Sequence, residues 1–181
     1  MIERSRQTRS RSTSVALSFA FAMFAFFLVV PSAAAQDDVP PPPQVVSKDE
    51  RARLNATSST KERTKLALEM MIGHLSAAER SNTSQDHDAT LRELGSFHGM
   101  LEEALGYLIA MDRRGEDVLD SFKRFEMGMR GFASRVEGIH RELPLKYDEY
   151  LASLLKRIRD ARARAVDQFF DDTVVRQPSH L

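Results

Sequence analysis

The chain has 181 residues and no cysteine, which excludes disulfide bonds, zinc–thiolate sites, iron–sulfur clusters, covalent c-type haem and a lipoprotein anchor. Hydrophobic residues make up 42% of the chain and charged residues 29%, as in ordinary globular domains. Residues 1–35 hold four arginines and one glutamate, so residues 36–181 carry 22 basic and 25 acidic side chains. This balance gives no global attraction to nucleic acid.

Residues 1–35 contain the three parts of a secretory signal peptide. A polar segment with four arginines precedes the apolar run 15–30, and Ala33 and Ala35 supply the small residues of a cleavage site. We therefore expect cleavage after Ala35 and a periplasmic or secreted protein. The alternative is an uncleaved membrane anchor, but the run is short of the ~20 apolar residues that span a bilayer, and Pro31 ends it.

A proline-rich linker is expected over residues 36–47. Four consecutive prolines, 40–43, remove backbone donors and favour an extended left-handed conformation. We expect a stiff spacer, with a proline-rich ligand for a partner protein as the alternative.

Two helix starts are predicted in the next segment. Ser47 and Glu50 have the spacing of a capping box, and Ser59 and Glu62 repeat it. The polar residues 55–60 compete with a helix for backbone hydrogen bonds, so the first helix is expected to break or restart there. Its inward positions are Leu68, Met71, Leu75 and Ala78.

The second helix is predicted over residues 86–113, and Gly115 fits the left-handed position that ends it. Two apolar stripes widen its buried face. Their members are Leu91, Leu94, His98, Leu101, Leu105 and Leu108 in one, and Phe97, Ala104 and Met111 in the other.

The third helix carries the clearest stripe in the chain. Seven apolar residues recur at alternating steps of four and three, which predicts one long helix over residues 118–141 that other helices must cover. They are Val118, Phe122, Phe125, Met129, Phe132, Val136 and Ile139.

Pro144 fits the first turn of a fourth helix, whose inward residues are Tyr147, Leu151, Leu154, Ile158, Ala161 and Ala165. The sequence thus predicts an all-α protein. We expect a left-handed, up-down-up-down antiparallel four-helix bundle over residues 48–172, with the spacing of a coiled coil and a flexible tail at 173–181.

Glycines interrupt two of these helices, at a cost of about 1 kcal/mol each relative to alanine. Such a cost predicts the close approach of another helix, either within the chain or at an interface. The glycines are Gly95, Gly99 and Gly106 in the second helix and Gly128, Gly131 and Gly138 in the third.

His98 is the candidate ligand-binding residue because it lies on an inward stripe, between Leu94 and Leu101. A neutral imidazole could bind haem iron or copper there, with Met71 or Met129 as a second ligand. The favoured alternative is a histidine at the edge of the core that is hydrogen-bonded to a neighbouring side chain.

The densest basic run could bind an anionic membrane, a polysaccharide or nucleic acid. Its members are Lys156, Arg157, Arg159, Arg162 and Arg164. All of them lie off the apolar stripe of their helix, so a solvated face paired with acidic side chains of other helices is the favoured interpretation.

Two weaker patterns favour structural roles. Glu137 and His140 have the E-x-x-H spacing of di-iron bundles, but no second copy occurs in the mature chain. Met127 and Met129 could hold Cu(I), but they point to opposite sides of their helix, which favours core packing.

No catalytic motif is found: the sequence lacks a cysteine nucleophile, a G-x-S-x-G elbow, a phosphate-binding loop and a dinucleotide-binding glycine pattern. We expect an exported, non-enzymatic helical bundle that acts through contact with an unknown protein or with itself, without a cofactor and without nucleic acid. The alternatives are a haem or copper carrier that uses His98, and a protein that binds anionic surfaces through the arginines of the last helix.

Overall fold

The computed structural model describes residues 40–175, with the side chains of 40–168. Within this range the regular structure is all helical, as predicted, and no β-strand is present. The elements are α2 (Lys48–Asn55), α3 (Thr60–Thr83), α4 (His87–Arg113), α5 (Leu119–Met129), α6 (Phe132–Glu142), the 3-10 helix η2 (Leu145–Tyr147) and α7 (Asp148–Val175). The predicted signal peptide lies outside the described residues. Residues 173–175, expected in a tail, belong to α7.

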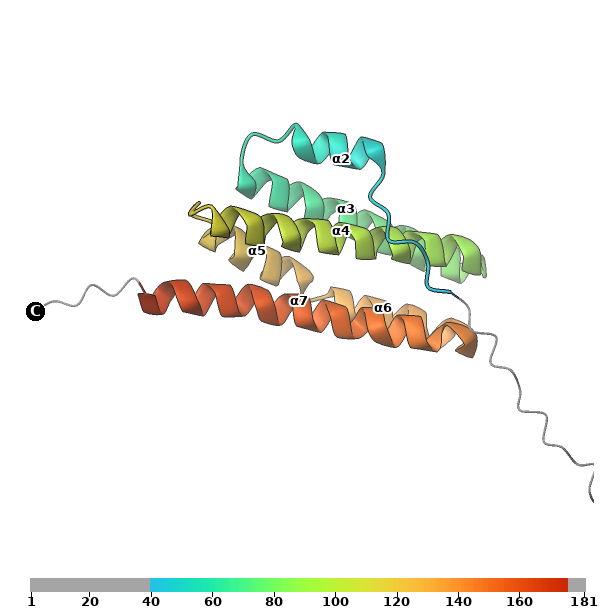
Figure 1. Ribbon diagram of the computed structural model, residues 1–181. Coiled ribbons are helices and arrows are strands. Elements are labelled where there is room, and N and C mark those ends of the chain that lie inside the picture. The colour runs from blue at the N-terminus through green and yellow to red at the C-terminus, as the bar shows by residue number, and fades with distance from the viewer. Residues whose placement is uncertain (1–39, 176–181) are drawn as a thin grey trace, which may run out of the picture. The chain divides into compact units, whose positions relative to one another are not determined.

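The long helices lie side by side with alternating directions (Figure 1). α3 and α4 are antiparallel neighbours, α5 and α6 follow one another in the direction of α3, and α7 returns along them. α2 lies on the outer side of α3. One hydrophobic cluster joins all of these helices.

The apolar stripe of residues 118–139 is buried as predicted, and each of its seven members is at most 3% exposed. Phe132 meets Phe97 of α4 edge to face, with the ring centroids 5.4 Å apart. Aromatic pairs favour this geometry because the positive ring edge meets the negative face of its neighbour. The periodicity therefore identified the core face of this segment correctly.

The prediction of one long helix over residues 118–141 is wrong. α5 ends at Met129 and α6 begins at Phe132, and the amide of Arg130 donates to the Met127 carbonyl at 3.4 Å in place of the usual four-residue bond. Gly128 and Gly131 weaken the helix on both sides of this point. Two shorter helices can then turn independently to bury their apolar faces.

The start signals near residues 47 and 59 are confirmed, as is the break between them. The Ser47 hydroxyl accepts from the Glu50 amide at 3.2 Å, and the Glu50 carboxylate accepts from the Ser47 amide at 2.9 Å. Ser59 caps α3 by accepting from the Glu62 amide at 3.2 Å, but the predicted second capping box is only half formed, because the Glu62 carboxylate accepts from the Ser58 hydroxyl instead. The last helix begins later than expected, because Pro144 precedes the 3-10 helix η2 and α7 starts at Asp148.

Residues 40–46, here called the strap, do not stand off the bundle as a spacer but lie along α4 (Figure 1). A Cβ added at Gly95 would stand 2.5 Å from the carbonyl oxygen of Pro43, and one at Gly99 would stand 2.9 Å from the nitrogen of Val45. The close approach expected at these glycines is therefore made by the strap and not by a helix. Gly106 has no such neighbour within 4 Å.

Candidate functional site

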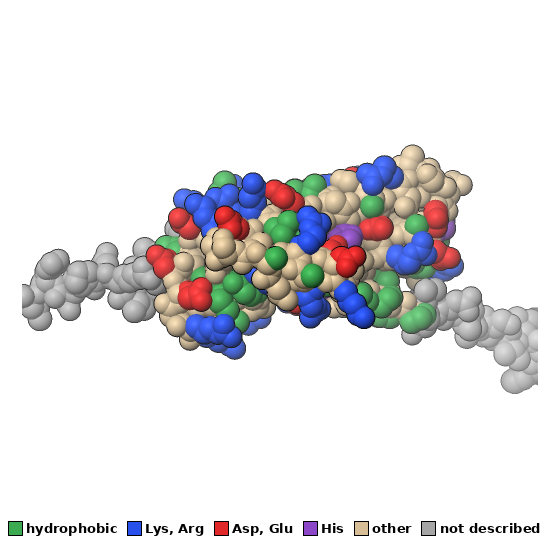
Figure 2. Space-filling view, turned by 90° about the horizontal axis from the view of Figure 1, so that it is seen from above, with side chains coloured by type: hydrophobic (Ala, Val, Ile, Leu, Met, Phe, Trp, Pro, Cys, Tyr) green, Lys and Arg blue, Asp and Glu red, His purple; other side chains and the backbone are tan. Residues whose placement is uncertain are grey.

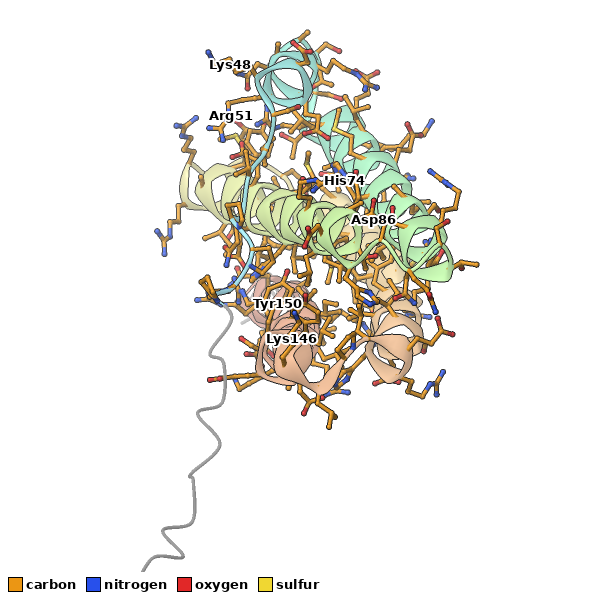
Figure 3. The ribbon with its side chains drawn as sticks, turned by 90° about the vertical axis from the view of Figure 1, so that its right-hand side faces the viewer. Lys48, Arg51, His74, Asp86, Lys146 and Tyr150 are labelled. Carbon is orange, nitrogen blue, oxygen red and sulfur yellow. The ribbon has the colours of Figure 1, made fainter. Side chains whose placement is uncertain are left out.

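A cavity of about 380 Å³ lies between the strap, α4 and the start of α7, and we call it the strap pocket. It combines residues from three separate segments of the chain, and Figure 3 shows Lys146 of η2 and Tyr150 of α7 beside the strap. The lining residues are Pro41, Gln44, His98, Lys146, Glu149, Tyr150 and Ser153.

His98 is buried, with 8% of the residue exposed, so its inward position was predicted correctly. Its Nε2 lies 3.6 Å from Oε1 of Glu102, and its Nδ1 is buried without a hydrogen-bond partner among the described residues. Met71 and Met129, the expected second ligands, are fully buried core residues and do not line the pocket. The site therefore surrounds His98 with oxygen and nitrogen groups, without a thioether.

The Glu102 carboxylate lies beside the His98 ring and is bound by Arg157. Hydrogen bonds from His98 and Arg157 lower the pKa of Glu102 to about 2, although burial acts to raise it. Arg157 makes the shorter contact, since its Nη2 donates to Oε2 at 2.6 Å. His98 is the more distant of the two groups beside this carboxylate, and its Nδ1 faces away from Glu102 without a hydrogen-bond partner among the described residues.

Tyr150 supplies the complementary group. Its hydroxyl is buried and lacks a hydrogen-bond partner among the described residues, and burial raises the pKa of this phenol. The Tyr150 and His98 ring centroids are 6.5 Å apart. Among the described residues, the strap pocket thus brings together an unpaired ring nitrogen and an unpaired hydroxyl, and buried polar groups without partners are uncommon in folded proteins.

A larger cavity of about 710 Å³ lies where the α2–α3 connection meets the α4–α5 connection. Its central polar groups are paired with one another. The Thr60 hydroxyl donates to Oε2 of Glu116 at 3.1 Å and lies 3.4 Å from the Tyr107 hydroxyl. The Thr60, Tyr107 and Glu116 side chains in this cavity therefore contact one another, unlike the unpaired His98 and Tyr150 atoms at the strap pocket.

The basic side chains of α7 are largely paired with carboxylates. Arg159 donates to Glu137 at 2.9 Å, Arg162 donates to Glu126 at 2.7 Å, and Lys156 donates to Asp160. With Arg157 bound to Glu102, four of the five predicted anion-binding residues engage an acid, while Arg164 is exposed. On the opposite side of the bundle, the face seen from α2, acidic and basic side chains are also interspersed (Figure 2).

The E-x-x-H pair and the two neighbouring methionines do not form a metal site in the structure. Glu137 pairs with Arg159, and His140 pairs with Asp148. Met129 is fully buried while Met127 is 54% exposed, so the two sulfurs do not converge. In residues 40–175 no group of three His, Cys, Asp or Glu side chains is placed to hold a metal ion, and none of the described helices is long and apolar enough to cross a bilayer.

His74 joins three helices, and the sequence analysis missed it. Its Nδ1 lies 2.8 Å from Oε2 of Glu93 on α4, and its Nε2 lies 2.7 Å from Oε1 of Glu50 on α2. Figure 3 shows His74 below α2, at the side of α4. Burial acts to raise the pKa of Glu50, but hydrogen bonds with Ser47 and His74 outweigh it and lower that pKa. His74 lies off the apolar stripes, so no local pattern could have identified it.

A second surface feature is a groove of about 520 Å³ between α3 and α5, here called the α3/α5 groove. Ile72 is 45% exposed and Met127 is 54% exposed, and both line it above Leu68. Charged side chains form its rim, namely Lys65, Glu69, Asp120, Lys123 and Arg124.

The chain matches no family model, no curated protein and no solved structure. The sites described above therefore rest on the geometry and chemistry of this chain alone.

Proposed function

We propose that this protein is an exported, non-enzymatic helical module that binds another protein through the α3/α5 groove. In this proposal its helices act as a left-handed four-rod bundle in up-down-up-down order, with α5 and α6 forming the third rod. The observation that carries the proposal is that two large apolar side chains, Ile72 and Met127, are exposed and line the same groove. Exposed apolar surface with a polar rim is typical of protein interaction sites.

The occupant we propose is an amphipathic helix of a partner protein. A groove between two helices accepts such a helix through apolar anchors spaced three or four residues apart. Methionine suits this role because its flexible side chain adapts to the shape of a partner. Apolar side chains of the partner would seat between Ile72 and Met127.

The rim charges favour an acidic partner helix. Three of the five charged rim residues are basic, and Lys65 is already engaged with Glu69 at 3.7 Å. Lys123 and Arg124 follow one another on α5 and are both exposed. Carboxylates of the partner placed opposite these two cations would gain complementary charge and set the orientation of the bound helix.

The histidine contacts support a non-enzymatic role. In the described residues the hydrogen-bonded histidines, His74 and His140, contact carboxylates, and His98 also lies beside one. None of these contacts activates a hydroxyl nucleophile, which would require a base next to a serine or threonine. We therefore assign the histidine–carboxylate contacts of the chain to binding and stability.

Photo-crosslinking in the native host tests the docking proposal. A photoreactive residue at Ile72 or Met127 should give the same discrete adduct, and one at the exposed Lys48 of α2 should not. Reversing the rim charge with K123E and R124E should remove the adduct. An adduct with the mass of two copies of this chain, or one that forms equally at Lys48, would contradict the proposed partner.

Export is tested separately by sequencing the N-terminus of the protein recovered from its host. We expect Gln36 as the first residue. A protein retained in the cytoplasm with Met1 intact would contradict the export part of the proposal and leave the groove test unaffected.

A further inference from the structure

Two polar atoms at the strap pocket, His98 Nδ1 and the Tyr150 hydroxyl, have no hydrogen-bond partner among the described residues. His98 Nδ1 can accept or donate a hydrogen bond according to the state of the ring, and Tyr150 offers a hydroxyl. Both atoms are buried without a partner. A ligand hydroxyl can satisfy both at once, since it donates through its hydrogen and accepts through its oxygen.

The other polar residues that line the pocket can also form hydrogen bonds with a ligand. Lys146 is a donor and Glu149 an acceptor, while Gln44 and Ser153 can each donate and accept. Lys146 and Glu149 carry opposite formal charges, so these two side chains together add no net charge to the lining. Several hydroxyl groups on an uncharged frame fit this alternation of donors and acceptors better than a compact ion does.

From these observations we propose that the strap pocket binds a neutral, polyhydroxylated small molecule of about the size of a monosaccharide. One ligand hydroxyl lies between His98 and Tyr150, and others reach the polar groups at the rim. The cavity volume of about 380 Å³ lies within the range of small-molecule sites. This site is distinct from the α3/α5 groove and does not depend on it.

The strap forms one wall of this pocket, through Pro41 and Gln44. Glycines at positions 95 and 99 allow it to lie directly on α4. Because proline restricts the backbone in the free chain, little conformational entropy is lost when this wall is held in place. The pocket is thus largely formed before a ligand arrives.

Titration of the protein with glucose, galactose and myo-inositol tests the proposal, with acetate and zwitterionic glycine as probes that carry charged groups. The readout is NMR of protein labelled at histidine and tyrosine rings. We expect saturable shifts of the His98 and Tyr150 signals with at least one neutral probe, and none with acetate or glycine. A response to the charged probes alone, or no saturable response at high-millimolar concentrations, overturns the proposal.

Removal of single hydroxyls identifies the contact. Tyr150→Phe should weaken binding of the responding probe by about tenfold, which corresponds to one lost hydrogen bond, and Tyr107→Phe outside the pocket should leave it unchanged. Ser153→Ala, at an exposed position, provides a second variant that preserves the fold. Unchanged affinity in both Tyr150→Phe and Ser153→Ala overturns the proposal, because the probe then binds without contacting either hydroxyl.

Discussion

Gly99 of α4 lies directly beneath Val45 of the strap, so closely that a Cβ at residue 99 would stand 2.9 Å from the Val45 nitrogen and 3.0 Å from the carbonyl carbon of Gln44. Both atoms belong to the backbone and cannot rotate away as a flexible side chain can. The strap and α4 can therefore keep this contact only with glycine at position 99.

The first prediction concerns this contact. Gly99→Ala should displace the strap and lower the free energy of unfolding by about 1–3 kcal/mol, the usual cost of an added methyl group in a packed site. Hydrogen exchange of the strap amides and chemical denaturation measure the two effects. The matched control is Gly106→Ala, which meets nothing within 4 Å and should raise stability by about 1 kcal/mol through helix propensity. Equal stabilisation by both variants would show that the strap does not rest on α4.

The stripes of apolar residues could be predicted from the sequence because helix periodicity is a local property. The burial of Phe122, Phe125 and Val136 follows from their spacing alone. The interruption at Arg130 and the course of the strap could not be predicted in the same way. The strap packs against Gly95 and Gly99, and Leu68 of α3 packs against Gly128 next to the interruption. Such contacts between segments far apart in the sequence are determined by tertiary packing.

The candidate site was predictable only in part, for the same reason. The inward position of His98 followed from its stripe, but Tyr150 and Gln44 come from other segments and share no spacing with it. The role of His74 could not be predicted at all, because its two carboxylate partners lie on two other helices. Side chains that meet across elements leave no periodic signal in the sequence.

The second prediction tests His74 as the residue that holds α2 on the bundle. A neutral imidazole carries one N–H, so contacts to both Glu50 and Glu93 are satisfied together only by the doubly protonated ring. His74→Gln loses at least one of these contacts and should lower the free energy of unfolding by about 1.5–3 kcal/mol. Hydrogen exchange should accelerate at the α2 amides more than in α7.

The control for this variant is His140→Gln. His140 also contacts a carboxylate, that of Asp148, but the Asp148 side chain is 59% exposed. Exposed pairs contribute about 0–1 kcal/mol, so this variant should change stability little and leave α2 exchange unchanged. If both variants have the same small effect, His74 does not fasten α2.

The third prediction concerns acid stability. His98 and Arg157 lower the pKa of Glu102 to about 2 from the ordinary value of 4.5. A carboxyl whose pKa is depressed in the folded state contributes stability that is present above its unfolded pKa and is lost as the pH falls through its folded pKa. The difference in unfolding free energy between wild type and Glu102→Gln should therefore be constant above about pH 5 and shrink between about pH 4.5 and pH 2. A difference that does not vary across this range would contradict the role assigned to Glu102.

The last prediction separates ion pairing from surface binding on α7. The Arg162 guanidinium donates to Glu126 at 2.7 Å, and this carboxylate is 11% exposed, whereas Arg164 is exposed at the surface. Arg162→Gln should lower the free energy of unfolding by roughly 1–2 kcal/mol, moderated by the second contact of Glu126 with Arg130. Arg164→Gln should stay within about 0.5 kcal/mol of wild type. Co-sedimentation with vesicles that contain anionic lipid should show no salt-sensitive binding by either variant or by wild type. Binding that is lost in Arg164→Gln while stability is unchanged would instead favour a membrane-surface role for this helix.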